Sequence, residues 1–107
     1  MCREIFLAPE AVEDFEAVRA YDRAMLREAI ETHLRHEPTK TSKRRIRRLR
    51  GIRRPQYRLR VGEIRVFYDV TDREVEILAI VPKKEAAAWL ERYGQSDKTK
   101  GEDEEAE

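Results

Sequence analysis

The chain has 107 residues, of which 42% are charged, 40% hydrophobic and 7% aromatic, and its formal net charge is only +1. This length fits one domain and is too short for two. So many charged residues leave little apolar material for a large buried ligand cavity. We therefore expect the surface to carry the function.

The sequence favours a reducing, cytoplasmic setting. Its single cysteine, Cys2, excludes an internal disulfide, and no secretory leader opens the sequence. The longest uninterrupted apolar run, residues 77–81, is far shorter than the roughly 20 residues that cross a bilayer. No membrane span is expected.

The first residues predict a short strand followed by a helix. Residues 3–8 are rich in Ile, Phe and Leu, and Pro9 ends this strand while suiting the first turn of a helix. In the helix, Val12, Phe15 and Val18 recur at three-residue spacing and predict the buried stripe.

A second helix follows, with Asp22 as its candidate N-cap. It ends before Pro38, because the residue that precedes a proline resists the helical region. The two helices are expected to run antiparallel. The apolar stripe of the second helix consists of Leu26, Ile30, His33 and Leu34.

Two strands joined by a tight turn are predicted next. Along residues 57–61, apolar side chains alternate with Arg58 and Arg60, so the apolar set lies on one face and both guanidinium groups on the other. Gly62-Glu63 is typical of a two-residue hairpin connection. The returning strand places Ile64, Val66, Tyr68 and Val70 on one face and Arg65, Phe67 and Asp69 on the other.

The rest of the chain completes an α+β fold. After a turn at residues 71–73, residues 75–81 are apolar on both faces, as in a mid-sheet strand, and residues 84–93 predict a short helix. This order predicts an antiparallel meander with two helices on one face. Residues 95–107 contain no apolar residue larger than alanine and predict a disordered acidic tail after a domain of residues 1–94.

Positive charge is concentrated in one quarter of the chain. Residues 40–65 contain twelve lysines or arginines and one acid, Glu63, so this segment carries about +11. Such a concentration on ordered elements favours a phosphate-binding surface over a merely solvated face. The candidate RNA-binding residues in this segment are Lys43, Arg44, Arg45, Arg47, Arg48 and Arg50.

The order of elements and three segments, residues 49–51, 57–62 and 65–68, resemble the RelE/ParE superfamily of bacterial toxins over roughly residues 3–93. The basic, glycine-marked hairpin is the specific part of this resemblance, and it favours the RelE-like branch. The resemblance implies a toxin of a type II toxin-antitoxin pair, neutralised by an antitoxin. The RelE branch cuts mRNA in the ribosomal A site without a metal, whereas the ParE branch poisons DNA gyrase.

The resemblance also implies site residues. The RelE catalytic positions fall on Arg58, Arg60, Arg65 and Lys84, with Lys83 beside the last. They would surround the scissile phosphate, which the 2′-hydroxyl of the same nucleotide attacks. Arginine can bind phosphate oxygens in bidentate fashion and stabilise the extra negative charge of the transition state. RelE places lysines where this chain has Arg58 and Arg60, and arginine is a poor general base. Lys83 or Lys84 is therefore the candidate for proton transfer.

Trp89 and Tyr93 are the candidates for a base-stacking surface, because Leu90 stands where RelE has a tyrosine. For Trp89 a core position is the alternative. His33 and His36 are three residues apart but lack further metal ligands, so no metal or cofactor is expected.

Three functions remain open: an mRNA-cleaving toxin, a gyrase inhibitor, and a non-catalytic nucleic-acid-binding module. We expect a monomer when free and a hetero-oligomer with the antitoxin, with the ribosome and mRNA as targets. The acidic tail either solvates the chain or folds over the basic surface and competes with RNA.

Overall fold

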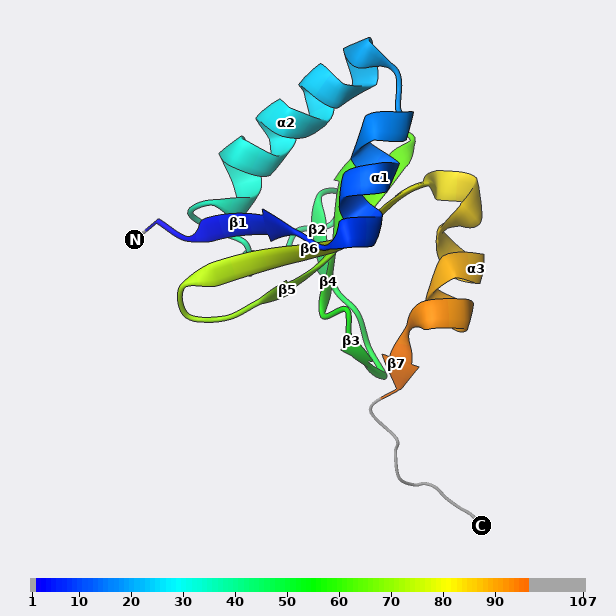
Figure 1. Cartoon of the computed structure of the whole chain (residues 1–107). Coiled ribbons are helices and arrows are strands. Elements are labelled where there is room, and N and C mark those ends of the chain that lie inside the picture. Colours follow the sequence, from blue (N-terminus) through cyan, green and yellow to red (C-terminus); the bar gives the residue numbers. More distant parts are fainter. Residues whose placement is uncertain (1, 97–107) are drawn as a thin grey trace.

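A five-stranded sheet with two helices on one face and a third helix on the other organises the chain (Figure 1). The structure is a computed structural model and describes residues 2–96. The sheet contains β1 (Glu4–Leu7), β6 (Glu74–Pro82), β5 (Ile64–Val70), β4 (Tyr57–Val61) and β2 (Ile46–Arg48), in that order. The helices are α1 (Pro9–Ala17), α2 (Ala20–Leu34) and α3 (Lys83–Tyr93). The predicted α+β class is confirmed.

The strands β4, β5 and β6 form the predicted antiparallel meander. The first strand is an addition to it, because β1 lies parallel to β6, with Leu7 opposite Ile77. The strand β6 therefore lies between β1 and β5. The predicted mid-sheet position is confirmed, and it explains the apolar residues on both faces of β6. Glu76, which pairs with Arg54, is the exception within residues 75–81.

The larger core lies between the sheet and the first two helices. Ala11 of α1 packs there, together with half-buried Phe15 and Val18. Val12, which the sequence assigned to the buried stripe, is 40% exposed, so that prediction is wrong. The small Ala11 side chain faces the sheet instead. The buried core residues of α2 are Leu26, Ile30 and Leu34, and His33 is half-buried.

The start of α2 also differs from the prediction. The helix begins at Ala20, and Arg19, not Asp22, occupies the N-cap position. Asp22 lies in the first turn, where its Oδ2 is 3.6 Å from Nε of Arg19. A carboxylate at this position interacts favourably with the positive end of the helix dipole without accepting a hydrogen bond from a backbone N–H.

The smaller core lies on the opposite face, beneath α3. The Trp89 ring stacks on Phe67 of β5, with ring centroids 4.9 Å apart and an interplanar angle of 6°. Ala79 and Val81 of β6 complete the buried floor of this cluster. No residue of α3 is fully buried, so this stacked pair carries much of the contact between helix and sheet.

The hairpin between β4 and β5 is as predicted. Gly62 has φ +58°, a value that glycine adopts without strain. The carbonyl oxygen of Glu63 accepts a hydrogen bond of 2.7 Å from the backbone N–H of Lys83. This bond places the start of α3 directly beside the hairpin turn.

Three short strands were not predicted. Within the basic segment lie β2 and β3 (Ile52–Arg54), and β3 pairs with β7 (Gln95–Ser96). Two residues assigned to the tail are therefore part of the fold. The remaining tail, residues 97–107 with its acidic run, lies outside the described residues. Within residues 2–96, no helix is long and apolar enough to span a membrane.

The buried Tyr68 hydroxyl donates a hydrogen bond of 2.7 Å to the Pro38 carbonyl and so ties the sheet to the segment after α2. Tyr68→Phe leaves that carbonyl unpaired and should lower the free energy of unfolding by about 1–3 kcal/mol in urea denaturation. Tyr57→Phe is the matched control, because Tyr57 stacks on Tyr68 but its hydroxyl makes no hydrogen bond within the described residues. Equal losses in both variants would contradict this role for the hydrogen bond.

Candidate phosphate-binding interface

Four arginines share the sheet face that α3 partly covers. Because residues paired across a ladder point to the same face, the pairs Arg47–Arg58 and Arg60–Arg65 place all four side chains opposite the larger core. We call these four residues the arginine cluster. Like charges so close together favour an anionic partner.

Arg58 is the least compensated member of the cluster. Its side chain is half-buried, and its Nε is buried without a hydrogen-bond partner in the described structure. Burial lowers the pKa of Arg58, and the charges of Arg65, Arg47 and Arg60 lower it further. Such a group costs free energy in the absence of an anion, and a phosphate bound at the cluster would offset its positive charge.

Arg65 is hydrogen-bonded to the backbone of the hairpin turn. Its side chain is only 6% exposed, and one terminal nitrogen donates hydrogen bonds of 2.8 and 3.0 Å to the carbonyl oxygens of Gly62 and Ile64. Burial lowers its pKa, as does the charge of Arg60, while Glu63 acts in the opposite direction. Arg65 therefore braces the hairpin turn from which Arg60 projects, in addition to contributing charge.

The predicted lysines lie at the same end of the sheet. Arg65 is paired with Val81, and α3 begins two residues later, beside the hairpin turn. Both Lys83 and Lys84 are exposed there. The structure thus brings Lys84 to the end of the sheet that carries Arg60 and Arg65.

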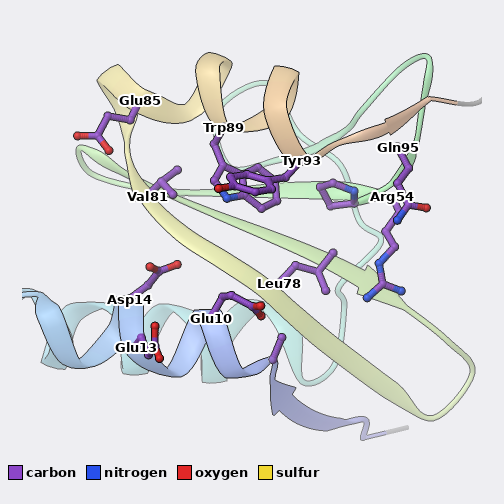
Figure 2. A pocket seen from close by; sticks show the side chains of 12 residues that line it. Glu10, Glu13, Asp14, Arg54, Leu78, Val81, Glu85, Trp89, Tyr93 and Gln95 are labelled. Carbon is purple, nitrogen blue, oxygen red and sulfur yellow. The ribbon is translucent and has the colours of Figure 1, made fainter.

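The two aromatic candidates lie on α3. Trp89 packs between Phe67 and Tyr93, whose ring centroid is 5.6 Å from that of Trp89. Trp89 therefore packs on the smaller core, in agreement with the alternative interpretation, and its role in base stacking stays a prediction. Tyr93 is 57% exposed and lines a groove on the β6 side of α3 (Figure 2). The arginine cluster lies on the other side of α3, over β5, β4 and β2.

The remaining predicted basic residues separate into two groups. Arg44 and Arg45 join Arg60 around a hollow of about 580 Å³ at Gly62, next to the cluster. Arg48 instead lies over the Tyr57 ring, 5.2 Å from its centroid, on the other face. Lys43 and Arg50 are exposed in the flanking loops.

Among residues 2–96, no group of three or more His, Cys, Asp or Glu side chains is placed to hold a metal ion. His33 is half-buried near Val61 and Gly62 of the β4–β5 hairpin. Its pKa is lowered by burial and by the charge of Arg45.

Comparison with known proteins identifies the family. Residues 5–87 match the family described as the ParE toxin of the type II toxin-antitoxin system, parDE. The chain belongs to this ParE toxin family. No curated protein is a significant sequence match to the chain.

Solved structures share the fold of this ParE-family chain. A chain of the RelB–RelE antitoxin–toxin complex from Methanococcus jannaschii has a TM-score of 0.61 and 20% identity, covering 78% of this chain and 96% of that one. A chain of the RelBE2 toxin–antitoxin complex from Mycobacterium tuberculosis has a TM-score of 0.61 and 21% identity, covering 77% of this chain and 99% of that one. A chain of the RelE–RelB complex from Pyrococcus horikoshii has a TM-score of 0.58 and 24% identity, covering 78% of this chain and 97% of that one. At these identities the likeness shows the fold alone.

The desolvated charge of Arg58 leads to a prediction. Arg58→Met should leave the free energy of unfolding unchanged or raise it by up to about 1 kcal/mol, because an unpaired buried charge is removed. It should also remove at least half of the increase in melting temperature that inorganic phosphate or sulfate gives the wild-type chain. Both effects are measured by thermal melting over a range of anion concentrations.

Arg73→Met is the matched control. Arg73 is exposed in the β5–β6 turn, and its side chain makes no hydrogen bond or ion pair within the described residues. The same anion effect in both variants would show that the cluster has no special affinity for phosphate.

Proposed function

We propose that this ParE-family toxin cleaves mRNA on the ribosome and that its arginine cluster holds the scissile phosphodiester. The observation that carries the proposal is Arg58, whose buried Nε lacks a partner and lies among three further arginines. A bound phosphate would offset the partly desolvated charge of Arg58 and the mutual repulsion of the cluster.

In the proposed reaction, the 2′-hydroxyl oxygen attacks the adjacent phosphorus while the bond from phosphorus to the 5′-oxygen breaks. The products are a 2′,3′-cyclic phosphate and a 5′-hydroxyl end. Arg58 and Arg60 stabilise the extra negative charge on the phosphoryl oxygens in the transition state. Arg65 holds the turn that positions Arg60.

Proton transfer needs a group other than arginine, which stays protonated in proteins. The proton of the 2′-hydroxyl must leave, and the 5′-oxygen must receive one. Lys83 and Lys84, exposed beside the hairpin turn, are the candidates on this chain. The ribosome is the proposed source of substrate orientation.

The proposed regulator is a cognate antitoxin. The structural neighbours are described as antitoxin–toxin complexes of RelB and RelE. An antitoxin that covers the cluster would place carboxylates against Arg47, Arg58 or Arg60, since these charges are costly to bury unpaired. The free toxin is proposed to be a cytoplasmic monomer.

Inhibition of DNA gyrase is the second candidate. The match to the ParE toxin family favours it. A gyrase inhibitor does not cleave RNA, so its activity would not require a phosphate site in the arginine cluster. A non-catalytic nucleic-acid-binding module is a third candidate, and harmless expression would distinguish it.

The test is induced expression in bacteria of the wild-type chain and of the double variant Arg58→Gln, Arg60→Gln. We expect the wild-type chain to stop growth and to create new mRNA 5′ ends inside translated codons. The frequency of cleavage should be at least 100-fold lower in the double variant, because it lacks the two charges that stabilise the transition state. Mapping of mRNA 5′ ends measures the effect.

The control double variant is Arg19→Gln, Arg73→Gln, which removes two exposed arginines away from the cluster. It should cut like the wild-type chain. Growth arrest without new 5′ ends, but with broken chromosomal DNA, would assign the chain to gyrase inhibition. The cognate antitoxin is defined operationally as the protein whose co-expression restores growth.

A further inference from the structure

A groove of about 590 Å³ lies between α1 and α3, beside β6 (Figure 2). Leu78 and Val81 of β6 and Trp89 of α3 supply apolar side chains to its lining, and exposed Tyr93 lies at its α3 side. This lining has room for one or two large apolar side chains of a partner.

Carboxylates from both helices border this apolar floor. Glu10 and Glu13 come from α1 and Glu85 from α3, and all three are exposed without an ion pair or hydrogen bond within residues 2–96. The one lining arginine, Arg54, is already compensated, because Asp69 and Glu76 lie 3.6 and 3.4 Å from its guanidinium nitrogens. The groove is therefore apolar at its base and negative at its border.

The adjacent edge of β6 is closed to strand addition at one point. The strand β1 ends at Leu7, opposite Ile77, so β6 continues beyond its neighbour. There the Oδ2 of Asp14 accepts a hydrogen bond of 3.0 Å from the backbone N–H of Ile80. With this donor occupied, recognition in the groove depends on side chains.

The groove and the arginine cluster lie on opposite sides of α3. Trp89 stacks on Phe67, which is the ladder partner of Arg58. A segment that crosses α3 would meet carboxylates on one side and guanidinium groups on the other. RNA fits only the basic side, because its phosphates are repelled by the acidic border.

We propose that this groove is a docking site for a basic segment of the antitoxin that carries an apolar anchor. A leucine or phenylalanine side chain occupies the floor beside Trp89, and a lysine or arginine lies between Glu85 and the α1 carboxylates. This inference rests on the proposed function for the identity of the partner. Its chemistry rests on the groove alone.

The first test uses Trp89, the only tryptophan of the chain, as the reporter. The probe is a Trp-free twelve-residue peptide of alternating lysine and leucine, and a glutamate–leucine peptide is its counterpart. The basic peptide should shift the Trp89 emission saturably. Its dissociation constant should rise at least 10-fold in a groove variant, Glu10→Gln, Glu13→Gln, Glu85→Gln.

The matched control variant is Glu16→Gln, Asp72→Asn, Glu91→Gln, which changes the net charge equally at exposed acids outside the groove. Here the dissociation constant should change less than 3-fold. Equal weakening in both variants, or the absence of a saturable emission change, would overturn the proposal. A response to the acidic peptide alone would do the same.

The second test uses the cognate antitoxin, defined above by its rescue of growth. It should bind the groove variant at least 10-fold more weakly than the control variant, while both variants still arrest growth. Equal antitoxin affinity would reject the antitoxin as occupant even if the basic peptide binds. Undisturbed growth with the wild-type chain would refute the proposed function, whereas the peptide titration judges the groove separately.

Discussion

The alternation of side chains along β4 and β5 is the constraint on which the rest of this structure depends. Each apolar residue that β4 contributes to the larger core, such as Leu59, has an arginine neighbour that must point to the opposite face. The chain therefore cannot bury this core without gathering arginines on the other side of the sheet. Arg65 is tolerated there because backbone carbonyls accept its hydrogen bonds. The Nε of Arg58 has no such acceptor within residues 2–96, and this difference is the reason for proposing Arg58, and not Arg65, as the main phosphate-binding arginine.

The helix α3 separates the arginine cluster from the rest of the surface. It is attached by the hydrogen bond at the hairpin turn, by the Trp89–Phe67 stack and by the β3–β7 pairing after its end. The arginine cluster lies on one side of the helix and the carboxylate-bordered groove on the other. The small net charge of the chain thus conceals two surfaces of opposite sign.

Much of the fold could be predicted from the sequence, because period-two alternation and the Gly62-Glu63 turn are local signals. The rotation of α1 could not, since Ala11 and Val12 are both apolar and only packing on the sheet selects the smaller side chain. The strands β2 and β3 were missed because arginines obscure the alternation there. Alternation and the hairpin turn place Arg58, Arg60 and Arg65 on one face, whereas Arg47 joins the cluster only through the pairing of β2 with β4. The groove depends on tertiary contacts between α1, β6 and α3 that no sequence spacing records. The hydrogen bonds of Arg65 are local, but they depend on a side-chain conformation that alternation does not specify.

Segregated charge on a nearly neutral chain has a consequence for recognition. At physiological ionic strength the Debye length is about 8 Å, so partners farther away experience little net field. Long-range steering toward nucleic acid is therefore expected to be weak, and the proposed phosphate site would act on a phosphate that is already close. A substrate delivered and oriented by a larger particle suits such a site better than free RNA does. The same reasoning favours an antitoxin that carries both signs of charge, since a purely acidic segment would satisfy the arginines but gain nothing from the groove beyond α3.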